Sequence, residues 1–219
     1  MIGIISFLLI WGPIVIPSVI FASAFYAYAK RDRDYAYLEK WCKKLFAAAL
    51  VFRVIDAGLK TLGQYLTWSK DGLSEHLLHT PLSSKIPTIF NHIGIFTKNN
   101  LGYFLYYSFS RFWLNILIAL VFAIIFYALL KGLKKYKDGF FEGGELELGL
   151  LCAFLAGWPN VVLFIPGTFV FIILLSIIHM AFLKKKYTTI GVPLLISAAA
   201  CLLWGSKLII VLHLSVLGT

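Results

Sequence analysis

Long apolar stretches constrain this chain more than any other feature of its sequence. Several runs of about twenty residues or more carry almost no charge, which is the length that a helix needs to cross the hydrocarbon layer of a bilayer. Of the 219 residues, 60% are apolar and 14% are charged. A soluble domain of this size has too little interior to bury so much apolar surface. We therefore predict an all-α integral membrane protein and exclude a soluble enzyme, a disordered tail and a disulfide scaffold.

The apolar pattern predicts six transmembrane helices in a single domain, a polytopic helical bundle. The stretch over 148–183 would be about 54 Å long as one helix. It must therefore contain two crossings, with the break at Gly157-Trp158-Pro159-Asn160. Pro13 and Pro17 predict kinks in the first helix. The predicted spans are residues 2–29, 45–68, 101–130, 142–158, 160–183 and 190–212, and residues 69–100 form a long outer loop.

The basic residues indicate how the chain is oriented. Twenty Lys and Arg against ten Asp and Glu give a net charge of +10, and the basic residues cluster in segments 30–44, 131–147 and 184–186. Cytoplasmic loops of membrane proteins carry an excess of Lys and Arg. All three basic clusters lie on the cytoplasmic side if both termini are outside, which is the orientation that we expect, and we expect the protein in the cell (inner) membrane. Because the basic residues lie beside apolar spans, we interpret their charge as facing the bilayer surface and predict no binding of nucleic acid.

Neither a metal nor a cofactor is predicted. Cys42, Cys152 and Cys201 are far apart and lack CxxC spacing, so we interpret them as small core residues. His76 and His79 of the outer loop could face one metal ion. No cysteine and few acids accompany them, which favours a polar loop over a metal site.

Charged residues inside the predicted spans are costly in a bilayer and are therefore candidates for function. Arg53, Asp56 and Lys60 lie three and four residues apart and share one face of their helix. Arg111, with Asn115 one turn further, lies in the next span. Both Asp56 and Arg111 are expected about 15 to 16 Å into the membrane. We expect a contact between them, or a polar patch that includes Arg53, acting as a proton or substrate site or as a structural clamp.

Small residues that recur every four positions predict close packing between membrane helices. Two such stripes are present, one in the predicted span 142–158 and one in the last span. They consist of Gly149, Ala153 and Gly157, and of Ser197, Cys201 and Gly205.

The segment Glu142–Trp158 contains a glycine-rich turn, Gly143-Gly144-Glu145, and a predicted helix that ends in Gly157-Trp158. This pattern resembles the catalytic segment of the type IV prepilin peptidases, in which the turn ends in Gly-Asp and the helix often ends in Gly-Trp. Gly191-Val192-Pro193 resembles that family's Pro-rich entry to its final helix, so the likeness covers about residues 101–205. The resemblance implies a helical membrane core with two acids at the membrane edge, one of which holds a proton while the other activates water.

The resemblance makes Glu145 and Asp56 the candidate catalytic acids. Glu145 replaces the family's aspartate, and Asp56 is the only acid in the second predicted span. The longer Glu side chain can displace the carboxylate by about 1 Å, which can cost about a hundredfold in rate. The leading hypothesis is therefore a non-catalytic protein with a prepilin-peptidase-like core that binds or positions a membrane partner, such as a single-span pilin-like protein. The alternatives are an active aspartic membrane peptidase that cleaves a pilin-like substrate, and a small carrier or channel that uses the mid-membrane charges.

Overall fold

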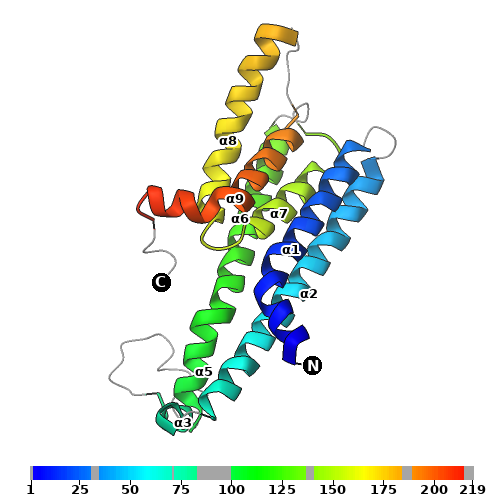
Figure 1. The fold of residues 1–219 in the computed structure, drawn as a ribbon. Coiled ribbons are helices and arrows are strands. Elements are labelled where there is room, and N and C mark those ends of the chain that lie inside the picture. Colours follow the sequence, from blue (N-terminus) through cyan, green and yellow to red (C-terminus); the bar gives the residue numbers. More distant parts are fainter. Residues whose placement is uncertain are drawn as a thin grey trace. The chain divides into compact units, whose positions relative to one another are not determined.

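The computed structural model describes residues 2–30, 35–70, 72–82, 100–136, 141–183 and 189–214, and every regular element in these ranges is a helix (Figure 1). The prediction of an all-α chain is therefore confirmed. Much of the predicted outer loop, including His92, and the lysines at 184–186 lie outside the described residues.

The chain divides into two compact units. The smaller unit contains Met1–Gly12 and Arg53–Ile116, and the larger unit contains Pro13–Phe52 and Leu117–Thr219. The long helices supply residues to both units: α1 (Ile2–Ala29), α2 (Tyr35–Trp68) and α6 (Leu114–Tyr136). Helix α1 includes both Pro13 and Pro17, the positions at which the sequence predicts kinks.

Four of the described helical stretches are long and apolar enough to cross a membrane. They are Trp11–Ala29, Gly102–Tyr136, Val161–Phe182 and Gly191–Val211. Each overlaps one of the predicted spans, which supports the interpretation of the chain as an integral membrane protein. The prediction of six crossings is not confirmed, and neither is the side on which the termini lie.

The two other predicted spans differ from these four in charge or in length. Helix α2 has 34 residues, about 51 Å, but its apolar part carries Arg53, Asp56 and Lys60. Helix α7 (Glu145–Ala156) has 12 residues, about 18 Å, which is shorter than the hydrocarbon layer of about 30 Å. As a single straight helix, α7 is too short to cross.

Helix α7 belongs to the core of the larger unit, where it packs against α8 (Val161–Ile178) and α9 (Gly191–Val211). Nine of its twelve residues are buried, as expected for a helix that is apolar around its whole circumference. The Phe154 ring lies 5.1 Å from that of Phe46 in α2, measured between centroids. At the predicted break, α7 ends at Ala156 and α8 begins at Val161, and Gly157 takes a positive φ of 68° that glycine adopts readily.

The smaller unit is organised by aromatic rings. It contains the second half of α2, α3 (Gly72–Leu78), α5 (Gly102–Ser108) and the π-helix η3 (Phe109–Trp113), which continues into α6. The Trp68 ring at the end of α2 contacts three rings of α5, with centroid separations of 5.1 to 6.2 Å: Tyr103, Phe104 and Tyr107. These contacts hold the end of α2 beside α5.

Candidate functional site

Two groups of polar residues carry the chemistry of the chain, one in each unit. In the smaller unit, we define the charged patch as Arg53, Asp56, Lys60, Arg111 and Asn115. In the larger unit, the Glu145 carboxylate forms the centre of a buried hydrogen-bond cluster, which we call the Glu145 cluster.

An ion pair within α2 forms the centre of the charged patch. Lys60 Nζ lies 2.6 Å from Asp56 Oδ2, and the two side chains are 35% and 18% exposed. Aspartate four residues before lysine is the favourable order for such a pair in a helix. Arg53 lies one turn before Asp56 and is half-buried. The charge of Asp56 is therefore compensated by a lysine of its own helix.

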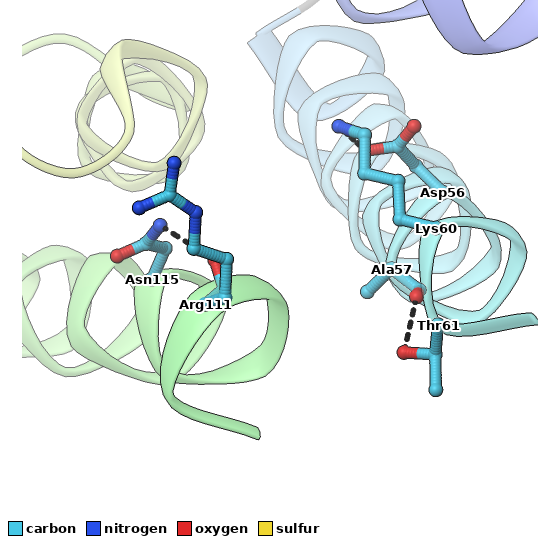
Figure 2. A network of polar contacts seen from close by, with 6 residues as sticks. All are labelled: Asp56, Ala57, Lys60, Thr61, Arg111 and Asn115. Carbon is cyan, nitrogen blue, oxygen red and sulfur yellow. Dashed lines mark hydrogen bonds and ion pairs between the residues drawn. The ribbon is translucent and has the colours of Figure 1, made fainter. Parts of the chain in front are cut away.

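Arg111 lies in the π-helix η3 and is exposed. The Asn115 side-chain amide donates to the Arg111 carbonyl oxygen at 3.3 Å. Figure 2 shows Arg111 and the Asp56–Lys60 pair on two helices, with no hydrogen bond or ion pair between them. The expected contact between Asp56 and Arg111 does not form, because Lys60 reaches the Asp56 carboxylate from one turn away on the same helix.

The two helices of the charged patch are joined by a hydrogen bond that the sequence analysis missed. Trp113 Nε1 donates to Thr61 Oγ1 at 3.2 Å, and the Thr61 hydroxyl donates to the Ala57 carbonyl oxygen at 2.8 Å. A tryptophan inside an apolar segment generally needs an acceptor for its N–H, which is the signal that could have drawn attention to Trp113. The Ser108 side chain is 2% exposed, and its buried hydroxyl has no hydrogen-bond partner among the residues that the structure describes.

The Glu145 cluster is fully enclosed, since the Glu145 side chain is 0% exposed. Oε1 accepts from the Gly191 N–H at 2.8 Å and from the Tyr28 hydroxyl at 3.2 Å, and Oε2 accepts from the Glu142 N–H at 3.0 Å. These donors belong to the first residue of α9, the last turn of α1 and the turn before α7. One carboxylate therefore connects the ends of three helices.

Glycines permit the close approach of the chain segments around Glu145. A Cβ at Gly191 would overlap the Tyr28 ring, and a Cβ at Gly143 would lie 2.8 Å from the Tyr35 Cβ. Gly144 has a φ of 82°, and a Cβ there would lie 2.9 Å from the Glu39 backbone nitrogen. The glycine-rich turn before α7 therefore packs closely against the start of α2.

The two predicted stripes of small residues lie at helix contacts within the larger unit. A Cβ at Gly149 would lie 2.6 Å from Leu130 of α6, and Ala153 is completely buried. The second stripe lies against the start of α8. Ser197 donates to the Phe164 carbonyl oxygen at 3.0 Å, Cys201 Sγ is 3.8 Å from the Asn160 carbonyl oxygen, and a Cβ at Gly205 would lie 2.6 Å from the Asn160 side chain.

The two predicted catalytic acids belong to different units. Asp56 belongs to the smaller unit and Glu145 to the larger unit, and the hydrogen-bond and ion-pair partners given above for the two carboxylates are different residues. Within the described parts of the chain, no group of three or more His, Cys, Asp or Glu side chains could hold a metal ion. Burial raises the pKa of the Cys42 thiol to about 12, so this cysteine stays protonated and unreactive near neutral pH.

Comparison with known proteins assigns no family to this chain. No protein-family model matches it, and no significant match was found among curated proteins or solved structures. The resemblance of Glu142–Trp158 to the type IV prepilin peptidases stays a sequence-based prediction.

Proposed function

We propose that this chain is a non-catalytic multi-pass membrane protein whose helical core binds or positions a membrane partner. The observation that carries the proposal is the enclosure of Glu145, whose carboxylate is 0% exposed and accepts hydrogen bonds from three donors. A general acid or base must come within hydrogen-bond reach of the proton that it transfers. Glu145 can do this only by giving up contacts that join helix ends.

The same contacts give Glu145 a structural role. An unpaired buried N–H costs about 1 to 3 kcal/mol, so the Gly191 N–H needs an acceptor at the beginning of α9. The Glu145 carboxylate supplies it and also accepts from Tyr28. This arrangement favours a clamp that fixes the helical core over an acid that acts on substrate.

Helix α8 supplies a surface for a partner that is itself a membrane helix. Its exposed apolar side chains follow the i, i+3, i+4, i+7 pattern of one helix face. They are Val170, Ile173, Leu174 and Ile177, which are 48 to 60% exposed. Another apolar helix could pack against such a face. The small residue Gly167 of α8 does not belong to it, because Gly167 packs against Ser197 of α9. A single-span protein is the partner whose chemistry fits this face.

The test compares processing with binding for one single-span pilin-like protein co-expressed in the same membrane. Photo-crosslinkers at Ile173 and Ile177 should form an adduct with the co-expressed pilin-like protein. Crosslinkers at Ile124 and Leu203, which are also exposed, should not. Glu145→Gln should leave the partner's length unchanged and should retain the adduct. Cleavage of the partner by the wild type that is abolished in Glu145→Gln would overturn the proposal, as would equal crosslinking at all four positions.

A further inference from the structure

We propose that the charged patch of the smaller unit is a binding site for the phosphate group of an anionic ligand. The patch contains three cationic side chains, Arg53, Lys60 and Arg111, and one acidic side chain, Asp56. Lys60 is paired with Asp56, and the exposed Arg111 guanidinium is the cation whose charge an anion would offset. This inference does not depend on the proposed function of the larger unit.

The cations of the charged patch come from two neighbouring helices. The hydrogen bond from Trp113 to Thr61 and the contacts of Trp68 with α5 hold the second half of α2 beside α5 and η3. In Figure 2, the Arg111 side chain and the Asp56–Lys60 pair extend to the same side of their two helices, toward the top of the view. The Thr61 hydroxyl lies on the opposite side of α2. The hydrogen bond therefore joins the helices without occupying the cationic side.

The side-chain types suit a phosphate group. A guanidinium offers a planar set of N–H donors that can bind two phosphate oxygens at once, and lysine adds a point charge. In the described parts of the chain, the Arg111 guanidinium forms no ion pair with a carboxylate, and its side chain is exposed. Arg111 also lies in a π-helical segment, a deviation from α-helix that frequently occurs at functional sites.

The position of Arg111 along its helix places the patch near a membrane surface. The apolar helix runs continuously over Gly102–Tyr136, 35 residues, and is about 52 Å long. Arg111 precedes Lys131 by twenty residues, or about 30 Å, which equals the thickness of the hydrocarbon layer. If Lys131 lies at one surface, Arg111 lies at the level of the other. This depth differs from the mid-membrane depth predicted from the sequence, which assumed that the helix begins at the membrane edge.

Aromatic residues around the patch agree with this depth. Trp and Tyr are enriched at the membrane–water interface, where lipid headgroups lie. The smaller unit concentrates such residues where α2 meets α5 and η3: Tyr65, Trp68, Tyr103, Tyr107 and Trp113. A phosphate at this level can come from an acidic lipid headgroup or from a water-soluble phosphate, and the experiment separates these two sources.

The experiment measures binding of two radiolabelled probes to the full chain in phosphatidylcholine nanodiscs. Phosphatidic acid incorporated in the nanodisc tests the lipid source, and inorganic phosphate in solution tests the soluble source. At least one probe should bind saturably. Arg111→Gln should weaken that binding about tenfold or more, because a charge-assisted hydrogen bond is lost. Arg111→Lys should fall between wild type and Arg111→Gln, since lysine retains the charge and loses the planar donors.

Two further variants make the test specific. Lys207→Gln, which removes an exposed lysine of α9, has the same charge change and should alter binding less than twofold. Asp56→Asn removes the one acid of the patch and should strengthen binding several-fold. The proposal is overturned if neither probe binds, if Arg111→Gln and Lys207→Gln behave alike, or if Asp56→Asn abolishes binding. Thermal unfolding of each variant checks that the fold is retained.

Discussion

Replacing Glu145 by alanine tests whether the buried carboxylate holds the larger unit together. The variant removes the acceptor of the buried Gly191 N–H and one of the partners of the buried Tyr28 hydroxyl, which also lies 3.4 Å from the Thr189 Oγ1. At about 1 to 3 kcal/mol for the unsatisfied Gly191 N–H and about 1 kcal/mol for the lost Tyr28 hydrogen bond, the expected loss of unfolding free energy is about 3 kcal/mol. This is a large share of the roughly 5 to 15 kcal/mol that stabilises a typical domain. We expect the variant to unfold about 10 °C below the wild type.

The assay is the fraction of monodisperse protein that remains in detergent after heating, followed by size-exclusion chromatography. Tyr28→Phe removes the hydroxyl that donates to Glu145 and lies 3.4 Å from the Thr189 Oγ1, and it leaves the carboxylate in place. It should lower the midpoint by about 3 °C, in line with about 1 kcal/mol. Glu75→Ala, at an exposed acid of α3, is the matched control and should leave the midpoint unchanged. If Glu145→Ala and Glu75→Ala melt within about 2 °C of each other, the carboxylate does not act as a clamp.

Three further predictions concern the backbone, the thiols and the topology. Gly144→Ala should destabilise the protein by about 2 kcal/mol or more, because φ is 82° and the Cβ would meet the Glu39 nitrogen. The control is Gly58→Ala, whose Cβ would have no atom nearby, and this variant should raise the thermal midpoint or leave it unchanged. Cys42, with its pKa raised to about 12 by burial, should react with a maleimide at neutral pH only after denaturation, and rapid labelling of the folded protein would contradict its burial. Single cysteines introduced at His76 and Lys134 should be labelled from opposite sides of sealed vesicles, and labelling of both from one side would show that the predicted orientation is wrong.

The sequence predicted the features that depend on neighbouring residues. The break between α7 and α8 follows from Gly157 and Pro159, which act on the backbone where they stand. The Asp56–Lys60 pair has the spacing of four residues that favours an ion pair within one helix, although the partner predicted for Asp56 was Arg111. In each case, the interacting groups are a single turn or loop apart, so periodicity and local stereochemistry are sufficient.

Features that depend on distant segments were beyond the reach of these arguments. The donors to Glu145 include Tyr28 and Gly191, which are 117 and 46 residues away. The residues next to Glu145 in the sequence therefore could not predict that its side chain is buried. The π-helical turn at Arg111 changes the face of the helix on which its side chain lies. No residue pattern in the sequence predicted this turn. The predicted membrane span begins at residue 45, where Lys40, Lys43 and Lys44 end the apolar run. The helix itself begins earlier, at Tyr35, since lysine is a good helix former.

The shortness of α7 has a consequence for how the chain is made. A segment of 12 residues that is followed by non-helical backbone exposes polar groups that lipid cannot satisfy, so α7 is a poor candidate for insertion on its own as it leaves the ribosome. We expect it to enter its final environment only when α8 and α9 have been synthesised and can surround it. A nascent chain stopped at residue 183 should therefore leave α7 accessible to added protease, and release of the complete chain should protect it.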